Sequence, residues 1–194
     1  MVLENIEVYG LKKSIKASKY PMSTDISKLN SDITPRVKSL GKARTGSGHS
    51  QFLHGIIVQF DLTFSNKAWV EAERYHWLEF VSSQSTMHRA TEFKLKEQCN
   101  EYVDEDIIAI VQKKIDMYNS LEDKSTDFAK DLYLKVLYNI PSGFQLTAAM
   151  TTNYEQLKTI YYQRRNHRLP EWQKLCKQIE KLPYFREIVL GDDN

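Results

Sequence analysis

The segment DEDIIAIVQKKIDMYN, residues 104–119, constrains the fold most, because its apolar residues recur three and four positions apart. This spacing predicts an amphipathic helix that buries one face, with Asp104 as its N-cap. The segment STDFAKDLYLKVLYNI, residues 125–140, has the same spacing, a Ser or Thr cap and a proline directly after it. By contrast, FLHGIIVQFDLTF, residues 52–64, is rich in β-branched and aromatic residues and predicts a strand. A chain with both kinds of element belongs to the α+β class.

The rest of the sequence continues this mixture. Residues 2–11 alternate apolar and polar side chains and predict a first strand that ends at Gly10. Thr34 followed by Pro35 predicts the start of a helix, whereas the glycine-rich residues 44–51 predict a loop. Residues 143–152 are expected to form a strand or an extended link. Further helices are expected at 12–22, 67–81, 153–166, 169–182 and 183–191. The sequence has no repeat or long linker, so we expect one domain over residues 1–194.

Composition and charge exclude several functions. The chain has 194 residues, of which 41% are hydrophobic, enough to bury the core of one domain, with or without a small subdomain. Its formal net charge of +2 is too small for a protein that coats nucleic acid or acidic surfaces. The N-terminal segment MVLENIEVYGLKK lacks the apolar core of a signal peptide, and no apolar run approaches the length of a membrane span. We therefore expect a cytoplasmic protein without membrane contact.

Metal and nucleophile chemistry find no support in residue spacing. Cys99 and Cys176 lie far apart, without a CxxC motif, and are expected to pack as small hydrophobic thiols. The five histidines form no pair at the short spacing of a metal site, so no metal is expected. The sequence also lacks a P-loop, a dinucleotide fingerprint and a GxSxG motif.

Three polar clusters remain as candidate binding segments. GSGHSQ, residues 46–51, combines His49 and Ser50 with two glycines that let a backbone approach a ligand closely; the alternative is an ordinary loop. SSQSTMHR, residues 82–89, places hydroxyls and an arginine at the expected end of a helix, which suits an anion; the alternative is a capped turn. YYQRRNHRLPEW, residues 161–172, suits a phosphate clamp beside stacking rings, or a solvated basic face at a helix C-terminus.

In their order along the chain, these clusters resemble the flavin-dependent thymidylate synthase family. That family has a Gly-His segment that runs into a strand, and then a signature of the form RHRxxSxNxxSxRY on a long helix. Later it has a helix ending in proline, an Asn that opens a helix ending in arginine, and a tryptophan-containing helix. This chain has, in the same order, GHSQFLHGIIVQFDL, RYHWLEFVSSQSTMHR, VLYNIPSGFQLTAAMTTN, NYEQLKTIYYQR and LPEWQKL. The positions in step with the family pattern in the C-terminal half are Pro141, Asn153, Leu157, Arg164 and Trp172.

The resemblance covers residues 44–180 and departs from the family pattern within the signature. With Arg89 on the last arginine of the signature, WLE at 77–79 replaces the RHR residues, and Arg74 falls where the family has a glutamine facing the nucleotide. Aligning RYH at 74–76 with RHR instead adds three residues before the serines. The first alignment keeps four polar matches and is preferred. Glu155 stands where the family has an arginine at the flavin, and no arginine holds the nucleotide just before Pro141.

The resemblance implies a single domain with a central antiparallel or mixed sheet packed with helices. In the family, FAD lies between the subunits of a homotetramer and a stacked nucleotide receives a one-carbon unit from methylenetetrahydrofolate, with NADPH as a co-substrate and no protein nucleophile. It therefore implies a methyltransferase that acts on a pyrimidine deoxynucleotide, converting dUMP to dTMP. The residues implied to contact the flavin are His49, Ser50, Gln84, Asn153 and His167. The residues implied to hold the nucleotide are Arg74, Thr86, Met87, Arg89 and Arg164.

Two alternatives to this enzyme stay open at the level of sequence. The first is a non-catalytic homologue, kept as an oligomeric nucleotide-binding, flavin-binding or scaffold protein, which the replaced RHR residues and Glu155 favour. The second is a nucleic-acid-binding module that uses the arginines at 164–168 and the nearby tyrosines. The small net charge gives this second alternative no support.

Overall fold

A computed structural model describes residues 2–191, and its centre is a four-stranded antiparallel sheet in the order β1-β2-β4-β3. The predicted α+β class is confirmed. The strands are β1 (Val2–Tyr9), β2 (Ile57–Ser65), β3 (Glu79–Ser83) and β4 (Gln145–Asn153). The α-helices are α1 (Leu11–Ala17), α2 (Pro35–Lys42), α3 (Asn66–Ala72), α4 (Thr86–Arg89), α5 (Leu95–Gln98), α6 (Glu105–Asn119), α7 (Asp127–Asn139), α8 (Tyr154–Arg164) and α9 (Pro170–Ile179). Shorter helical turns are η1 (Tyr20–Met22), η2 (Ile26–Lys28), η3 (Gln51–Gly55) and η4 (Arg186–Leu190).

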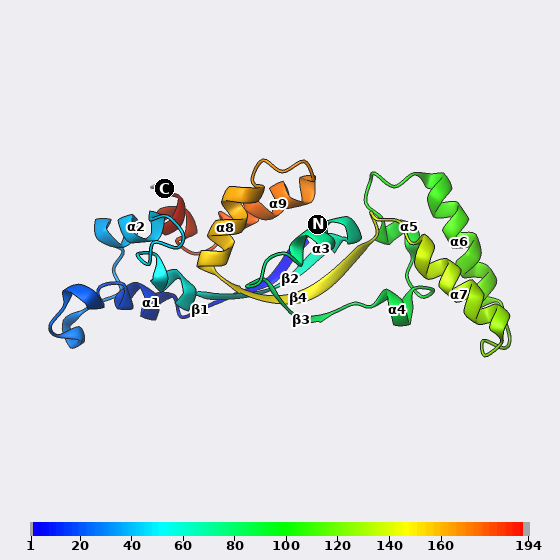
Figure 1. The fold of residues 1–194 in the computed structure, drawn as a ribbon, viewed down its shortest axis with the longest axis horizontal. Helices are drawn as coiled ribbons and strands as arrows, with labels where there is room; N and C mark the ends of the chain where they lie inside the picture. The colour runs from blue at the N-terminus through cyan, green and yellow to red at the C-terminus, as the bar shows by residue number, and fades with distance from the viewer. Residues whose placement is uncertain (1, 192–194) are drawn as a thin grey trace.

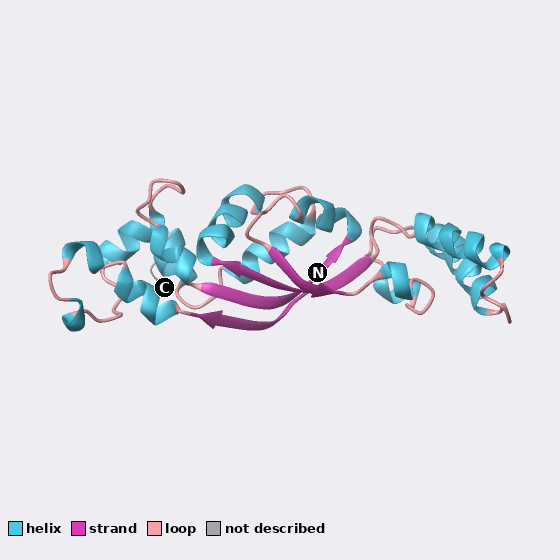
Figure 2. Ribbon diagram, turned by 60° about the horizontal axis from the view of Figure 1, so that its bottom comes forward, coloured by secondary structure: helices cyan, strands magenta, loops and turns pink. Residues whose placement is uncertain are grey.

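Helices cover one face of the sheet. Figures 1 and 2 show α3, α8 and α9 together on this face, while the opposite face carries no helix from the described part of the chain. The pattern of β2 explains the asymmetry, because Val58, Phe60 and Leu62 are buried toward the helices while Gln59 and Thr63 point to the open side. A sheet with one polar face and one apolar face needs only a single layer of helices.

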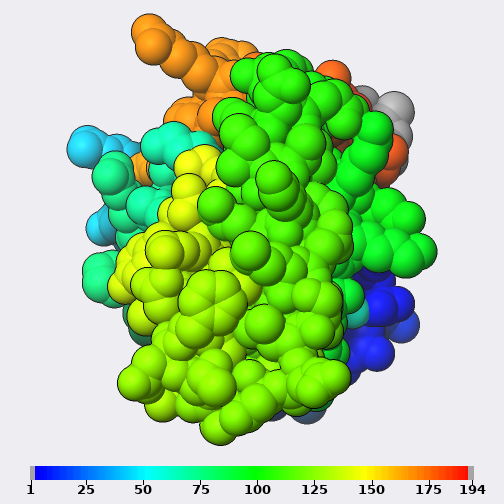
Figure 3. Space-filling view, turned by 90° about the vertical axis from the view of Figure 1, so that its right-hand side faces the viewer, coloured from blue at the N-terminus to red at the C-terminus, as the bar shows by residue number. Residues whose placement is uncertain are grey.

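The predicted helices at 104–119 and 125–140 are confirmed as α6 and α7, which together form a helical arm beyond one end of the sheet. Figure 3 shows the molecule from this end, where the two helices fill most of the visible face. The arm has its own hydrophobic cluster, in which Ile108, Val111, Ile115, Val136 and Phe144 are buried. The side chain of Asp104 occupies the N-cap position of α6 but makes no capping hydrogen bond.

The predicted helix at 67–81 is wrong beyond Ala72. After α3 the chain turns, and residues 79–83 form β3, which pairs with β4 at the edge of the sheet. Tyr75 and Leu78 are buried, so the apolar spacing of the turn continues that of α3 and imitates a longer helix. Phe80 then folds back to pack on Trp69, with 5.0 Å between the ring centroids. SSQSTMHR is therefore the end of a strand followed by the short helix α4, and not the end of a helix.

Close backbone packing holds α2 against η4 at the end of the sheet away from the arm. A Cβ atom on Gly41 would lie 2.4 Å from the carbonyl oxygen of Ile188 and 2.6 Å from its Cγ2. Thr34 caps the other end of α2, as predicted, by accepting a hydrogen bond from the N–H of Val37 at 3.3 Å. Only glycine lets the helix approach this closely.

We expect Gly41→Ala to lower the free energy of unfolding by about 1–3 kcal/mol, because the added methyl group forces α2 away from η4. Urea denaturation measures the change. Ser39→Ala, at an exposed position of the same helix, is the control and is expected to stay within about 0.5 kcal/mol of the parent chain. An equal, small effect of both substitutions would contradict the close packing.

Candidate functional site

A groove runs around the indole ring of Trp77, a residue that is 57% exposed. Three cavities of about 450, 370 and 420 Å³ share Trp77 in their walls and together form this groove. Its walls come from the loop and η3 within 45–57, the turn and start of β3 within 74–79, and the end of β4 with α8 within 151–164. We call it the Trp77 groove.

The pairing of β2 with β4 explains why these segments meet. Ile57, the first residue of β2, pairs with Asn153, the last residue of β4. The N–H of Tyr154 then donates to the carbonyl of Ile56 at 3.0 Å, so α8 begins directly beside η3. The side-chain oxygen of Asn153 caps α8 by accepting a hydrogen bond from the N–H of Gln156 at 2.9 Å.

Positive and negative side chains line different parts of the groove. Arg74, His76 and Arg164 line one of its cavities. Glu79 and Glu155 line the other two, which lie toward η3 and the glycine-rich loop. This arrangement suits a ligand that carries an anionic group at one end and hydrogen-bond donors at the other.

Arg164 is held by other side chains of the same chain. Its Nη1 lies 3.0 Å from Oε2 of Glu71, and its Nε donates to the hydroxyl of Tyr75 at 2.7 Å. The guanidinium also lies over the ring of Trp172, 4.8 Å from the centroid. His167, predicted to contact the flavin, lies behind this pair, with Nε2 3.2 Å from Glu71. Arg164 therefore forms an ion pair with Glu71 and also lines the groove.

The structure brings four of the predicted flavin and nucleotide residues together. Ser50, Asn153, Arg74 and Arg164 all line the Trp77 groove. His49 lies in the adjacent glycine-rich loop, where it is exposed and does not line the groove. The predicted loop at 44–51 is confirmed up to Ser50, and the strand that follows begins at Ile57, five residues later than expected, because η3 intervenes.

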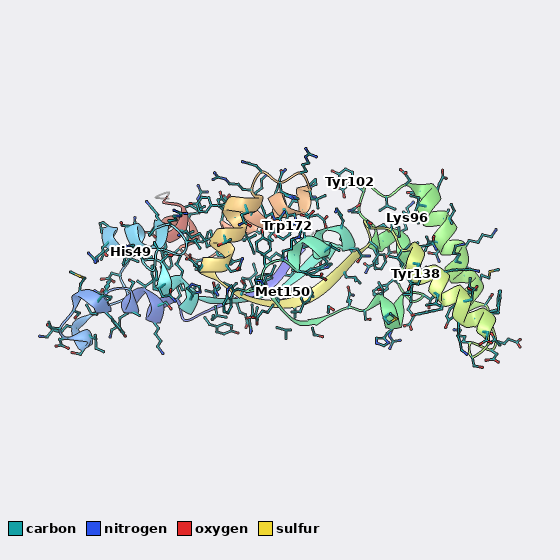
Figure 4. All side chains as sticks on the ribbon, in the orientation of Figure 1. His49, Lys96, Tyr102, Tyr138, Met150 and Trp172 are labelled. Carbon is teal, nitrogen blue, oxygen red and sulfur yellow. The ribbon has the colours of Figure 1, made fainter. Side chains whose placement is uncertain are left out.

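The other predicted residues lie toward the opposite end of the molecule. Figure 4 shows His49 in the half of the molecule away from the helical arm, whereas α4, which contains Thr86, Met87 and Arg89, lies toward the arm in Figure 1. Arg89 is exposed and forms an ion pair with Glu92 at 2.7 Å. The predicted flavin and nucleotide residues thus form two separate groups within one chain.

Gln84 belongs to the second of these groups. It extends the pairing of β3 with β4: its N–H donates to the carbonyl of Thr147 at 3.0 Å, and its side-chain oxygen accepts from the N–H of Thr147 at 2.9 Å. Its side chain is therefore hydrogen-bonded to β4 at the edge of the sheet.

Several residues that line the groove are not predicted as site residues from the sequence. In the sequence, Trp77 stands at a replaced position of the signature and His54 lies in a predicted strand, yet both line the groove. Two buried oxygens that no side chain or backbone group of residues 2–191 hydrogen-bonds also belong to lining residues: Oε2 of Glu155 and Oγ1 of Thr152. The departure of Glu155 from the family pattern is the sequence feature that singles out this residue, and no sequence pattern marks Thr152.

A separate cavity of about 450 Å³ lies where the helical arm joins the sheet, and Lys67, Arg168 and Lys174 are among its lining residues. Glu171 also lines it, but Ser65 satisfies this carboxylate through its N–H at 2.8 Å and its hydroxyl at 2.7 Å. None of the predicted flavin or nucleotide residues, all of them described, lines this cavity. The Trp77 groove is therefore the candidate functional site.

Metal and thiol chemistry have no visible site in the described residues. Among residues 2–191, no group of three or more His, Cys, Asp or Glu side chains is arranged to hold a metal ion. Both cysteines are free thiols. Burial raises the pKa of Cys176 to about 12 and also raises that of Cys99, so both thiols stay protonated at neutral pH.

The sequence matches no protein-family profile and no curated protein, but the fold has clear structural relatives. A crystal structure of thymidylate synthase ThyX from Helicobacter pylori with FAD and dUMP is 17% identical, has a TM-score of 0.70 and matches over 96% of each chain. Another, of the flavin-dependent thymidylate synthase ThyX from the same organism with FAD and dUMP, is 15% identical, with a TM-score of 0.69 over 97% of this chain and 100% of its own. The chain described here has the fold of these flavin-dependent thymidylate synthases.

We expect Arg164→Ala to lower the free energy of unfolding by about 2–4 kcal/mol, because it leaves the half-buried Glu71 without its arginine partner. Arg74→Ala, at an exposed position of the same groove, is expected to change stability by less than about 0.5 kcal/mol. Urea denaturation compares the two variants. Equal effects would show that the Glu71 pair contributes nothing to the fold.

Proposed function

We propose that this chain is a flavin-dependent thymidylate synthase-like protein that transfers a one-carbon unit to a pyrimidine deoxynucleotide bound in the Trp77 groove. One observation carries the proposal: in a chain with the ThyX fold, basic side chains and an exposed indole ring line the same groove. The nucleotide of the H. pylori structures is dUMP, and FAD accompanies it there. In this proposal FAD is the cofactor, and methylenetetrahydrofolate and NADPH are the co-substrates.

The residues of the groove fit a nucleotide and a flat ring. Trp77 offers an exposed surface on which a ring can stack. Arg74 and His76 are exposed in the same cavity and can pair with a phosphate, while Ser50 and the backbone at Gly46 and Gly48 can approach a second group. When bound, FAD would supply hydride and one-carbon transfer; the side chains bind, orient and exclude water.

The distance between the groove and α4 favours a site shared between copies of the chain. Arg89, Thr86 and Met87 cannot reach the groove of their own chain, because they lie toward the other end of the molecule. The helical arm also exposes large apolar side chains, as an oligomer interface would require. These are Ile107, Ile110, Met117, Phe128, Leu134 and Tyr138. We therefore propose a homo-oligomer, of the tetrameric kind that the resemblance implies, in which α4 of one copy approaches the groove of another.

Flavin and nucleotide binding test this function directly. Purified protein that is yellow, or that shifts the visible absorbance of added FAD and then binds dUMP or a related nucleotide, supports it. Colourless protein that ignores both FAD and pyrimidine deoxynucleotides contradicts it. Formation of methylated nucleotide from methylenetetrahydrofolate and NADPH completes the test of the enzyme.

We expect Arg74→Ala to weaken nucleotide binding about 10- to 100-fold, because it removes one charge-assisted hydrogen bond to the phosphate, while the flavin absorbance is retained. Arg89→Ala is expected to weaken binding only under conditions in which the protein is oligomeric. Calorimetric titrations at protein concentrations above and below the point of dissociation separate the two effects. A loss of binding on Arg89→Ala in a monomeric protein would contradict the shared site.

A non-catalytic homologue is the second candidate, and a specific observation favours it. Trp77, Leu78 and Glu79 stand where the resemblance implies RHR, so charge that would pair with the FAD diphosphate is missing, and Glu79 adds an opposite charge to the groove. A protein that binds a nucleotide, remains colourless with FAD and forms no methylated product would fit this candidate.

The predictions of a single domain, a cytoplasmic location and no nucleic-acid partner belong to the same proposal. In the part of the chain that the structure describes, no helix is both long and apolar enough to cross a membrane. Salt-dependent DNA binding that disappears when Arg164 and Arg165 are replaced would contradict the last of these predictions.

A further inference from the structure

Glu155 carries a buried carboxyl oxygen that receives no hydrogen bond from the described residues. It is the second residue of α8, it is 5% exposed, and it lines the Trp77 groove. Its Oε2 atom is buried, and no group within residues 2–191 donates a hydrogen bond to it. A polar oxygen removed from water without a partner destabilises the folded chain, so such a group needs an explanation.

Glu171 provides an internal comparison. It is the second residue of α9, it is also buried, at 8% exposed, and both of its carboxylate oxygens bond to Ser65. The favourable interaction of an acidic group with a helix N-terminus is available at both positions. That interaction does not require burial, and at Glu171 the burial is compensated by hydrogen bonds that Glu155 does not have.

The donors next to Glu155 in the chain form hydrogen bonds with other groups. The ammonium group of Lys158 donates to the carbonyls of Gly41, at 2.8 Å, and Ala43. Burial lowers the pKa of Lys158, and the nearby charge of Glu155 partly offsets this. The N–H of Gln156 donates to the side chain of Asn153. Glu155 lines the groove together with Trp77 and His54, so a ligand bound there can bring a donor to its carboxyl group.

A carboxylate accepts hydrogen bonds and cannot donate them, which determines the ligand it selects. An exocyclic amino group on a pyrimidine ring donates, and carboxylates are established partners of the cytosine amino group. At the same ring position uracil has a carbonyl, which accepts and would face the carboxylate with like polarity, and its donor on that edge is the neighbouring ring N–H. A carboxylate that meets the ring at the position of the amino group therefore favours cytosine over uracil.

We propose that Glu155 makes the Trp77 groove selective for an amino-bearing pyrimidine deoxynucleotide, of the dCMP type, over the uracil nucleotide dUMP. The ring stacks on Trp77, its amino group donates to Glu155, and its phosphate pairs with Arg74. This inference rests on the proposed nucleotide site in the groove, and it names the base that the site takes.

Calorimetric titration of the full chain with dCMP and with dUMP, with and without FAD, tests the proposal. We expect dCMP to bind about 5- to 100-fold more tightly than dUMP, because the two differ in the donor or acceptor that meets Glu155. Glu155→Gln is expected to reduce this preference to about threefold or less, because a side-chain amide can present either an oxygen or an N–H group. Glu155→Asp keeps the carboxylate and is expected to keep the order of preference with weaker binding of both.

Glu171→Gln is the matched control. It removes a buried carboxylate at the equivalent helix position outside the groove, and we expect it to lower the midpoint of urea denaturation while leaving the ratio of the two affinities unchanged. Glu155→Gln is expected to lower that midpoint less than Glu171→Gln does, because it breaks no side-chain hydrogen bond within residues 2–191 and removes only the charge of Glu155 near Lys158. A loss of stability in Glu155→Gln as large as in Glu171→Gln would overturn the assignment, since it would make Glu155 a structural residue.

The remaining outcomes separate this inference from the proposed function. Binding of dUMP as tight as that of dCMP, or a preference for dCMP that survives Glu155→Gln, overturns the role of Glu155 and leaves a nucleotide-binding groove in place. Failure of both nucleotides to bind, with or without FAD, overturns the inference together with the nucleotide site itself.

Discussion

The antiparallel pairing of β2 with β4 is the constraint on which the rest of the structure depends. It joins residues 57–65 to residues 145–153 without interruption and forms the centre of the sheet. One end of this pair delivers Asn153 and α8 beside η3 and so builds the Trp77 groove. The other end lies where the helical arm joins the sheet, because the N–H groups of Asn66 and Lys67 donate to the carbonyls of Phe144 and Ser142. A pairing across about ninety residues is costly in chain entropy, and the helices on its apolar face offset that cost.

The sequence predicts those parts of the fold that depend on interactions between residues close together in the chain. The two helices of the arm and the cap at Thr34 depend on spacing and on neighbours three or four residues away, and the sequence predicts them. It does not predict β3, because all five of its residues are exposed and no alternating apolar pattern marks it. Its partner β4 lies more than sixty residues along the chain, so propensity within the segment cannot reveal the pairing. The buried Tyr75 and Leu78 then made the turn before it resemble a helix.

The candidate site shows the same division. Ser50, Asn153, Arg74 and Arg164 were identified from their order along the chain, and the structure places all four in one groove. Trp77 and His54 both line the groove because the turn after α3 lies beside η3. This contact joins distant segments of the chain, so no local sequence pattern predicts it. Arg164 also pairs with Glu71 on α3, and the two side chains hold α3 to α8 beside the groove. A motif identifies residue types; the packing of helices decides which atoms remain free to bind.

A comparison of Glu155 with Glu171 separates a side chain that lines the groove from one that maintains the fold. Both occupy the second position of a helix on the same face of the sheet, but hydrogen bonds within the described chain are made only by the carboxylate of Glu171 and not by that of Glu155. The chain shares the ThyX fold at 15–17% identity, so few individual side chains are needed to maintain it. What maintains it is the apolar face of the sheet and a small set of partnered polar groups. The side chain of Glu155 lies outside that set of hydrogen-bonded groups. The ligand that we propose for the groove would supply the donor that its buried oxygen lacks.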